Sequence, residues 1–373
     1  TSNPDLAGNM GIDWRETHRL YNGPIKCRMH RGLAEHKEHY KRPLPVPQPP
    51  DPGRSEGLDF ANRLAKNCAP LFTWAEREGI SCFRLYDADL PDFNLSVDLY
   101  DGLALVREYA AANVDERKAH HRFNLAVQIV REVLQLPRSA LFLNPRPSKD
   151  TKQGKGQIPP GRLLEVTEDE CRFLVNLPGA PGTGLDLAQR TIRRTIGNLA
   201  QGKTFLNLFG GNGTATVHAL HGNVHTSTLV DPSPASLQRA RANFALNGFS
   251  GPQHATVEDD CLQWLAKCRT RYSLILVNPP SAGKDRKNRF AFNPQTDHGR
   301  LLRMAMQRLA RQGRLLFLAA SRKFTLDPFL YREFLVQEIT DRMTAEDFRQ
   351  GHHPLRCWEL AHRAEEGPAP DCG

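Results

Sequence analysis

A glycine-rich turn in the second half of the chain has residue types that suit cofactor binding. An apolar run over 204–209 ends in Asn207-Leu208-Phe209-Gly210-Gly211-Asn212-Gly213, and helix-forming residues follow. Glycines in such a turn let the backbone approach a ligand closely, and the helix that follows can direct its N-terminus at the ligand. The next apolar run ends at Asp231, eighteen residues after Gly213. This spacing is close to the roughly 20-residue offset at which an acidic side chain accepts ribose hydroxyls.

Two further polar positions follow apolar runs later in the chain. Asp260 comes after a short run near 255–257, and Asn278-Pro279-Pro280 ends the run over 273–277. Two prolines forbid a helix and give a stiff turn with few hydrogen-bond donors. A glycine-rich turn alone also fits a nicotinamide enzyme, or a tight turn that packs a helix on a sheet. The joint pattern is typical of S-adenosylmethionine-dependent methyltransferases, and a nicotinamide site would not explain the Asn-Pro-Pro motif.

The elements around these motifs are predicted to alternate between helix and strand. Repeated units of this kind, with unbroken apolar strands, predict an α/β fold with a parallel, doubly wound sheet. Ligands of such sheets bind at the carboxyl ends of the strands. The pattern predicts helices over 189–199, 214–220, 234–247 and 260–267, and strands over 204–209, 227–230, 255–257 and 273–277.

The first half of the chain predicts smaller pieces. Asn22-Gly23 lies between two β-prone runs within 17–29 and predicts a hairpin. Six prolines within 41–53 predict a semi-extended spacer. Residues beyond it predict a small α+β domain, with a helix near 60–75 that Gly79 can end. The expected organisation is a terminal hairpin (1–40), a Pro-rich linker (41–53), an α+β RNA-binding domain (54–180), a methyltransferase domain (181–363) and a disordered tail (364–373).

The strands expected in the small domain cover 82–88, 94–100, 103–109, 141–144, 163–166 and 173–177, with a helix near 115–136. Within 94–100 the apolar residues alternate strictly, with Leu95, Val97 and Leu99 on one face. Asp101-Gly102 predicts a tight turn into the next strand.

Composition narrows the class of protein. The 373 residues are enough for about two or three domains. Lys and Arg number 50 against 41 Asp and Glu, a net charge of +9 that favours an anionic partner such as nucleic acid.

No apolar run approaches the roughly 20 residues of a membrane span, and no signal-peptide pattern begins the chain, so a cytoplasmic protein is expected. The eight cysteines form no CxxC pair and the histidines have no ligand spacing, so no metal is expected.

Basic residues gather in three segments that could contact RNA. A Gly- and Pro-bearing loop holds Lys149, Lys152 and Lys155, and basic residues after Pro280 precede Phe290 and Phe292. Basic side chains interleaved with aromatic ones suit phosphate contacts and base stacking. The alternative for the Gly- and Pro-bearing loop and for the helix near 60–75 is a solvated surface. The alternative for the segment after Pro280 is a charged loop that caps a helix whose phenylalanines belong to the core. The RNA-binding candidates are Arg63, Lys66, Lys149, Lys152, Lys155, Lys284, Arg286, Lys287 and Arg289.

Several segments closely resemble the C-terminal half of the RlmKL family of bifunctional bacterial 23S rRNA guanine methyltransferases. They are FANRLAKN (60–67), RLYDADLP (84–91), FLNLFGGNGTATVHA (205–219), ARANFALNG (240–248), DCLQWL (260–265), LILVNPP (274–280) and FNPQTDH (292–298). TSNPDLAGNMG (1–11) and THRLYNGPIKC (17–27) look like the final hairpin of that family's N-terminal half. The resemblance implies a Rossmann-like class I methyltransferase domain after a small α+β domain. It also implies formation of 7-methylguanosine in 23S rRNA, with the N-terminal half of the same polypeptide as a partner.

The resemblance also implies roles for individual residues. Asn207, Phe209, Gly211 and Gly213 would hold the methionine side of S-adenosylmethionine, Asp231 the ribose and Asp260 the adenine. Asn278, Pro279 and Pro280 would form the catalytic motif beside the target base.

Four motifs depart from the family pattern. The loop Phe-Ala-Tyr-Thr-Gly is Phe209-Gly210-Gly211-Asn212-Gly213 here, and Asp-Pro-Pro is Asn278-Pro279-Pro280. Ala188-Gln189 replaces an Asp-His pair, and Ala319-Ala320 replaces an Asn pair. Because these changes cluster near the expected pocket, a non-catalytic rRNA-binding or ribosome-assembly module stays open as an alternative.

The chemistry of the expected reaction demands few groups. Ring nitrogen 7 of guanine carries a free lone pair and no proton, so placing it in line with the methyl group can suffice. Methylation at carbon 5 of a pyrimidine would need a cysteine nucleophile, and Cys261 and Cys268 lie outside the predicted base pocket. Methylation at the guanine exocyclic amine remains an alternative, although Ser281 cannot stack a base as an aromatic residue would.

Overall fold

The computed structural model describes residues 13–22, 25–33, 42–109, 115–145, 163–177, 182–280, 292–349 and 355–363. Its internal contacts divide the chain into two units, Thr1–Arg42 and Pro43–Gly373. Each unit is described by itself.

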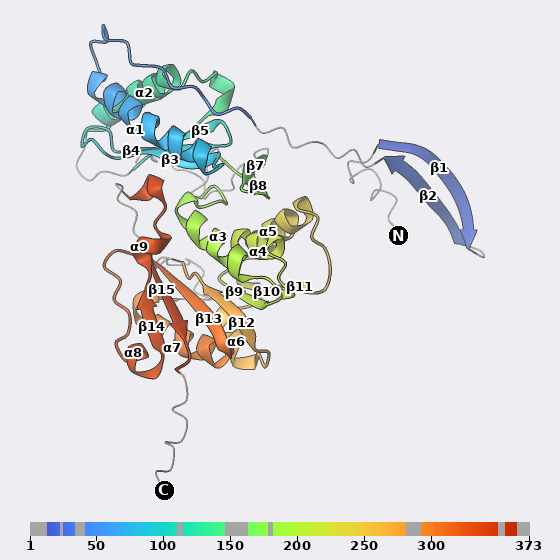
Figure 1. Ribbon diagram of the computed structural model, residues 1–373. Helices are drawn as coiled ribbons and strands as arrows, with labels where there is room; N and C mark the ends of the chain where they lie inside the picture. Colours follow the sequence, from blue (N-terminus) through green and yellow to red (C-terminus); the bar gives the residue numbers. More distant parts are fainter. Residues whose placement is uncertain are drawn as a thin grey trace. The chain divides into compact units, whose positions relative to one another are not determined.

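The first unit contains a β-hairpin (Figure 1). Strand β1 (Asp13–Asn22) pairs antiparallel with β2 (Ile25–Leu33), and Asn22 lies opposite Ile25 at the closed end. The predicted hairpin is confirmed, and its strands extend beyond the 17–29 range expected from the sequence.

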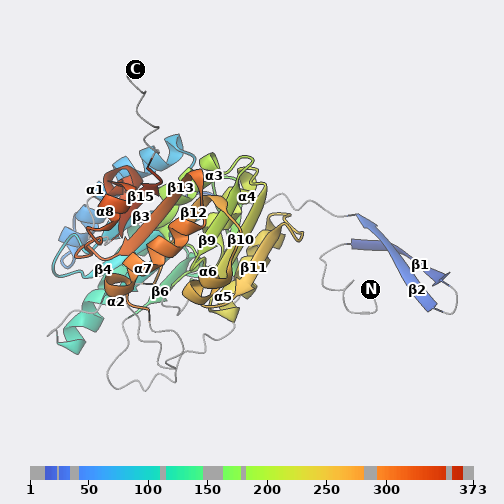
Figure 2. The same cartoon turned by 90° about the horizontal axis from the view of Figure 1, so that it is seen from below.

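The second unit is built on a seven-stranded sheet in the order β11-β10-β9-β12-β13-β15-β14 (Figure 2). Five of these strands are parallel, and they correspond to the apolar runs of the sequence: β9 (Thr204–Leu208), β10 (Thr226–Asp231), β11 (His254–Glu258), β12 (Tyr272–Val277) and β13 (Leu309–Ala320). The α/β, Rossmann-like class is confirmed. The sheet is not wholly parallel, because β14 (Leu335–Glu338) and β15 (Leu355–Ala361) add an antiparallel edge, a common feature of large sheets.

Helices cover both faces of this sheet. Residues of α3 (Arg190–Leu199), α4 (Thr214–His221) and α5 (Pro234–Leu246) share one apolar cluster with Phe205 of β9. Residues of α6 (Cys261–Lys267), α7 (Pro294–Gln307) and α8 (Leu330–Glu333) share the other cluster with Leu206 and Leu208. Successive strand residues point to opposite faces, so the unbroken apolar runs follow from burial on both sides.

A smaller sheet, in the order β3-β4-β5-β6, belongs to the same unit. It consists of β3 (Cys82–Asp87), β4 (Leu95–Tyr100), β5 (Leu103–Glu108) and β6 (Leu141–Asn144), and a separate hairpin is formed by β7 (Leu164–Glu168) and β8 (Cys171–Val175). Helices α1 (Leu58–Arg77) and α2 (Glu116–Val133) pack on one face of the sheet. Gly79 follows α1 with φ of 66°, as expected of a residue that ends a helix.

The turn between β4 and β5 shows why the sequence specifies this register. Asp101 and Gly102 both have positive φ, 52° and 79°, and Tyr100 pairs directly with Leu103. Such two-residue turns match the twist of the strands, and they favour Asp-Gly.

The apolar residues of β4 alternate strictly, as the sequence predicts, yet both faces of the strand are covered. All six residues of β4 are buried. Leu95, Val97 and Leu99 pack towards α1 and α2, whereas Tyr100 belongs to the cluster of the large sheet. The polar face of the small sheet is therefore covered by the rest of the unit.

A buried ionic network connects the small strands with the large sheet. Arg193 of α3 donates from Nε and Nη2 to the two carboxylate oxygens of Glu168 in β7, both at 2.6 Å. Arg190 donates to both oxygens of Asp347, which lies in a short helical turn over Glu346–Phe348, at 3.0 and 3.1 Å. Asp347 also accepts from the backbone N–H of Arg84 at 2.9 Å. Four charged side chains thus hold together three elements: α3, which supplies both arginines, β7 and the turn over Glu346–Phe348.

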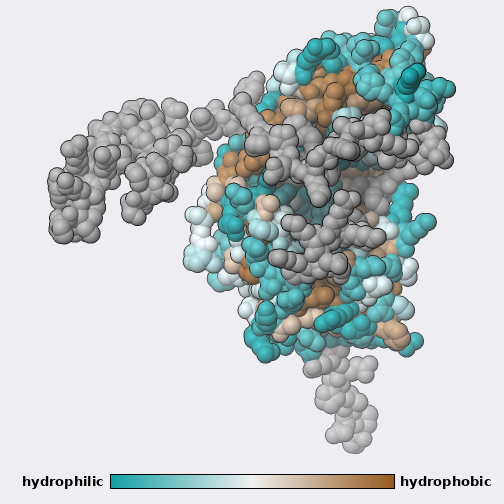
Figure 3. Space-filling view, turned by 180° about the vertical axis from the view of Figure 1, so that it is seen from behind, coloured by the Kyte–Doolittle hydropathy of each residue, from teal (hydrophilic) through white to brown (hydrophobic). Residues whose placement is uncertain are grey.

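The surface of the second unit is mostly hydrophilic on the face shown in Figure 3, with apolar patches between polar regions. Leu44 of the Pro-rich segment packs on the cluster of α1 and α2, and Gln48 N donates to Val133 O at 2.7 Å. Across the described ranges, no helix has both the length and the apolar character needed to span a membrane.

Candidate active site

The glycine-rich loop follows β9 and leads into α4. Gly213 is the N-cap of α4 with φ of 73°, and Phe209 and Gly211 also have positive φ, 56° and 51°. A β-carbon at Gly213 would lie 2.9 Å from Phe244 Cε1 and 3.0 Å from Ala240 Cβ. Glycine is therefore required there both by conformation and by the close approach of α5.

We expect Gly213→Ala to destabilise the fold by more than the 1–3 kcal/mol that a left-handed residue costs on average. The reason is that the added methyl would also displace Phe244 and Ala240. Gly202→Ala is the matched control, because Gly202 has φ of 66° but open space around its Cα. Denaturant unfolding of both variants checks the difference, and equal losses would show that the close approach to α5 has no effect.

Asp231 lies beneath the loop at the end of β10. Its Oδ2 accepts from Gly211 N at 2.8 Å, and its Oδ1 accepts from Ser233 N at 2.9 Å. Burial raises the pKa of this carboxyl, and the two backbone hydrogen bonds oppose that rise. The carboxylate is thus held between the glycine-rich loop and the start of α5.

Asn207 lies behind the loop. Its Nδ2 donates to Thr216 Oγ1 at 3.0 Å, which connects β9 to α4. Its Oδ1 is buried and has no hydrogen-bond partner among the described residues. A β-carbon at Gly210 would lie 3.0 Å from the Asn207 side chain, so Gly210 allows the loop to pass over it.

Two residues at the start of α6 extend the site to the third strand end. Asp260 caps α6 by accepting from Gln263 N at 2.9 Å. The Sγ of Cys261 accepts from Phe209 N at 3.3 Å and donates to Val230 O at 3.7 Å. Cys261 therefore connects the ends of β9 and β10. Burial raises the pKa of its thiol, which stays protonated.

Asn278 follows β12 on the other side of β9. Its backbone N–H donates to Leu208 O at 3.2 Å, and its Nδ2 donates to Gln189 Oε1 at 3.1 Å. Gln189 in turn donates to Asp186 Oδ2 at 3.1 Å. The side-chain amide of Asn278 is therefore oriented by the turn over Leu187–Gln189. Pro279 is buried and Pro280 is exposed.

A pocket of about 590 Å³ opens beside these groups, a volume within the usual range for small-molecule sites. Of the predicted site residues, Phe209, Gly211 and Asn278 line it. The other predicted residues do not line it: Asn207, Gly213, Asp231, Asp260, Pro279 and Pro280. Asn207, Gly213 and Asp231 instead support the loop, and Asp260 caps α6 at a neighbouring strand end. The opposite part of the lining comes from the small sheet: Arg84, Asp87, Asp98, Tyr100, Arg107 and Tyr109.

Two predicted RNA-binding residues line a second pocket, of about 570 Å³. Arg63 and Lys66 of α1 share it with Trp74 and Arg77. Arg84 and Asp87 line both this pocket and the first, so the two adjoin. Lys149, Lys152, Lys155, Lys284, Arg286, Lys287 and Arg289 lie outside the described residues.

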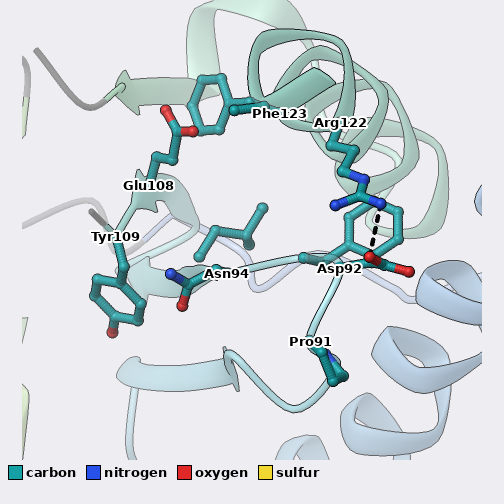
Figure 4. Close-up of a pocket in the computed structure, with 10 residues that line it drawn as sticks. Pro91, Asp92, Asn94, Glu108, Tyr109, Arg122 and Phe123 are labelled. Carbon is teal, nitrogen blue, oxygen red and sulfur yellow. Dashed lines mark ion pairs between the residues drawn. The ribbon is translucent and has the colours of Figure 1, made fainter. Parts of the chain in front are cut away.

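A third, much smaller pocket of about 50 Å³ lies between β5 and α2 (Figure 4). The ion pair of Arg122 with Asp92, at 2.7 Å, lies on its rim. Figure 4 shows the ring of Tyr109 directed away from Arg122 and Phe123. This pocket is too small for a nucleoside and is separate in its lining from the glycine-rich loop.

The sequence did not single out the wall provided by the small sheet. The alternation of β4 could have indicated this wall, because Ser96, Asp98 and Tyr100 must share the face opposite to Leu95, Val97 and Leu99. That face becomes part of a pocket only when the large sheet covers it. Gln189 was noticed as a departure from the family pattern, but its hydrogen bond to Asn278 depends on tertiary structure. Within the described ranges, no three His, Cys, Asp or Glu side chains are grouped to hold a metal ion.

The arrangement fits S-adenosylmethionine. The loop exposes backbone at Gly211, Asp231 supplies a fixed carboxylate beside it, and the pocket is large enough for the methionine end of the molecule and an acceptor group. Asp260 lies at the neighbouring strand end, two residues after the Glu258 that pairs with Asp231.

Comparisons with known proteins agree with this geometry. A family model described as S-adenosylmethionine-dependent methyltransferase matches residues 70–350. "Ribosomal RNA large subunit methyltransferase K/L" of Desulfotalea psychrophila is 40% identical over 364 residues, covering 97% of this chain and 50% of that protein. The chain thus spans about half the length of the curated relatives it matches.

Solved structures show the same fold. A putative S-adenosylmethionine-dependent methyltransferase from Streptococcus mutans has a TM-score of 0.65 at 20% identity, with 85% of this chain and 86% of that chain covered. A structure of SMU.776, a putative methyltransferase complexed with S-adenosylhomocysteine, has a TM-score of 0.62 at 18% identity, covering 80% and 81%. Since the family model covers well over half of the chain, the chain belongs to the S-adenosylmethionine-dependent methyltransferases, whose cofactor the pocket beside the glycine-rich loop has the residues to hold.

Proposed function

We propose that this chain transfers the methyl group of S-adenosylmethionine to nitrogen 7 of a guanine in 23S rRNA. The observation that carries the proposal is the pocket in which Asn278 and the glycine-rich loop face a charged wall. The resemblance to the C-terminal half of the RlmKL family and the similarity to a large-subunit rRNA methyltransferase support the substrate class. The N-terminal half of such a polypeptide is the expected partner, and the cytoplasm is the expected compartment.

The chain's own residues then act mainly by binding and orientation. S-adenosylmethionine supplies a sulfonium methyl group that is already activated for transfer. Gly211 lines the cofactor side of the pocket, Asp231 accepts from its backbone N–H and holds it in place, and Asp260 lies where the adenine is expected. Because guanine nitrogen 7 has a lone pair and no proton, no side chain needs to remove one, and in-line placement is the main requirement.

Asn278 lines the pocket beside the glycine-rich loop, where the resemblance to the RlmKL family implies the target base. Since its Nδ2 donates to Gln189, its Oδ1 is the group presented to a ligand as an acceptor. Both residues differ from the family pattern, and they fit each other, because Gln189 accepts the hydrogen bond that the Asn278 amide donates. This mutual fit supports a working site rather than an eroded one.

Thiol chemistry is not supported by the described cysteines. Cys261 is the cysteine in contact with the loop, and burial keeps its thiol protonated by raising its pKa. Burial also raises the pKa of Cys68, to about 12. Methylation at carbon 5 of a pyrimidine needs a thiolate in contact with the ring, and neither residue lines the pocket.

We propose that the RNA site continues onto the basic face of α1, because the pocket lined by Arg63 and Lys66 adjoins the pocket of the glycine-rich loop. We expect the double change of Arg63 and Lys66 to Ala to weaken binding of protein-free 23S rRNA. We also expect it to reduce the slope of log affinity against log salt by about 0.7–0.9 for each phosphate that is no longer neutralised. Lys118 and Arg138, both exposed, provide a control of equal charge when changed to Ala. An unchanged slope would place the RNA path elsewhere.

The experiment that tests the function uses isotopically labelled S-adenosylmethionine with unmodified, protein-free 23S rRNA, followed by nucleoside mass spectrometry. We expect labelled 7-methylguanosine. Label at the exocyclic amine or in another nucleoside would contradict the proposed site of methylation. If neither the chain nor the full-length fusion produces label while the chain retains RNA, the module is a non-catalytic binding protein.

A further inference from the structure

A β-bulge in β3 brings two charged residues onto one face of the small sheet. Arg84 pairs with Asp98, but the register shifts between Arg84 and Tyr86, so that Asp87 pairs with Ser96. Without the shift, residues three apart in a strand would point to opposite faces. Bulges re-aim side chains in this way and are frequent beside active sites. Here both Arg84 and Asp87 line the pocket of the glycine-rich loop.

Arg84 holds two carboxylates in fixed positions. Its Nε and Nη2 donate to Asp98 at 2.7 and 3.1 Å, and its Nη1 lies 3.1 Å from Asp87 Oδ2. Burial works against its charge, but Asp98 outweighs that effect and raises the pKa of Arg84 further. The guanidinium also lies over the ring of Phe348, 4.7 Å from its centroid. The group is therefore rigid and stays charged.

Tyr109 fixes the other oxygen of Asp87. Its hydroxyl donates to Asp87 Oδ1 at 2.6 Å. Burial raises the pKa of Tyr109 to about 12, so the hydroxyl remains a donor at neutral pH. Glu108 and Tyr109 point to opposite sides in Figure 4. Because side chains alternate along a strand, Arg107 lies on the Tyr109 side, away from Phe123.

Arg107 carries a donor on this face that lacks a partner. Its Nε is buried and has no hydrogen bond among the described residues. In the strand ladder Ser96 pairs with Asp87 on one side and with Arg107 on the other. A carboxylate and a guanidinium thus flank Ser96, with Cα atoms about 10 Å apart, two strand spacings. Arg107 lines the pocket of the glycine-rich loop, so its guanidinium can reach an acceptor on a ligand there.

We propose that the pocket wall formed by Asp87 and Arg107 selects the acceptor base. Arg107 donates to O6 of guanine, and Asp87 accepts from its N1–H and exocyclic amine. The inference rests on the proposed function, since it assigns the base contacts of the same site. Guanine presents an acceptor beside two donors along this edge, whereas adenine presents a donor beside an acceptor. The pair therefore accepts guanine and rejects adenine, and Arg84 and Tyr109 are positioning residues for Asp87.

The first test compares nucleosides on protein saturated with S-adenosylhomocysteine, with binding measured by calorimetric or NMR titration. We expect guanosine to bind more tightly than adenosine by roughly 10- to 100-fold, the discrimination of a good pair of base contacts. Arg107→Ala should abolish that preference, and Arg107→Gln should weaken it while keeping most of the side-chain volume. Arg122→Ala is the control, because Arg122 lines the small pocket of Figure 4 instead.

The second test measures methyl transfer to 23S rRNA. Arg107→Ala should lower the rate by roughly 10- to 100-fold, with S-adenosylhomocysteine affinity, rRNA retention and melting temperature unchanged. Equal binding of guanosine and adenosine to the wild type, or a full preference in both Arg107 variants, would overturn the inference. If the wild type transfers no methyl group but prefers guanosine through Arg107, the proposed reaction fails and the base-selecting wall stands.

Discussion

Changing Asp231 to Ala is expected to weaken S-adenosylhomocysteine binding by roughly 100-fold or more while leaving rRNA binding intact. The carboxylate orders the glycine-rich loop through Gly211 N and is the proposed acceptor of the ribose hydroxyls. Hydrogen bonds to a charged group each contribute about 1.5–3 kcal/mol, so losing two of them accounts for this factor. Calorimetric titration with S-adenosylhomocysteine and filter retention of 23S rRNA measure the two affinities separately.

The matched control for this prediction is Glu258→Ala. Glu258 pairs with Asp231 across β10 and β11, carries the same charge and is exposed. We expect its cofactor affinity to stay within a few-fold of the wild type. If Asp231→Ala lost cofactor and RNA binding together with a lower melting temperature, Asp231 would be a structural residue rather than a cofactor ligand.

The largest expected loss of stability follows from Glu168→Gln. Glu168 accepts from Arg193 twice, lies 3.8 Å from Arg190 and contacts His218 at 3.2 Å, and all four residues are buried. Neutralising it leaves the buried guanidinium of Arg193 without its carboxylate partner, while Arg190 keeps Asp347. Breaking a buried ion pair typically costs about 3–5 kcal/mol. Denaturant unfolding should show a lower midpoint with a similar slope.

The same network gives a pH dependence. Burial opposes the charge of Glu168, but Arg193 and His218 outweigh it and hold the pKa of the carboxyl well below its ordinary value of 4.5. Because the folded pKa is lowered, the contribution to stability is complete above about pH 5 and declines as pH falls below 4.5. Glu168→Gln should remove this part of the acid sensitivity.

Glu165→Gln is the control for both measurements. Glu165 is in the same strand, but its ion pair with Arg172 is about one-third exposed on each side. Exposed pairs contribute about 0–1 kcal/mol, so its unfolding midpoint should hardly change. A loss as large as that of Glu168→Gln would mean that β7 itself, and not the buried charge, determines the effect.

The local elements of this protein could be predicted because their signals are local. Strands β9, β10 and β12 are apolar runs buried on both faces, and Asp101-Gly102 suits only a turn with positive φ. The antiparallel edge formed by β14 and β15 could not be predicted from the helix–strand alternation. Short helices and strands still alternate after β13, but the direction in which a strand pairs depends on distant residues.

The sequence by itself determined the Rossmann-like class, the glycine-rich loop and the strand-end residues Asp231 and Asn278, because turn chemistry and strand periodicity depend on neighbours in the chain. Tertiary structure alone decided that Asp231 holds Gly211 and that Gln189 orients Asn278. It also decided that the polar face of β4 lines the pocket, where Arg107 keeps a buried donor. These contacts join residues from separate elements, so only the packing of the two sheets brings them together.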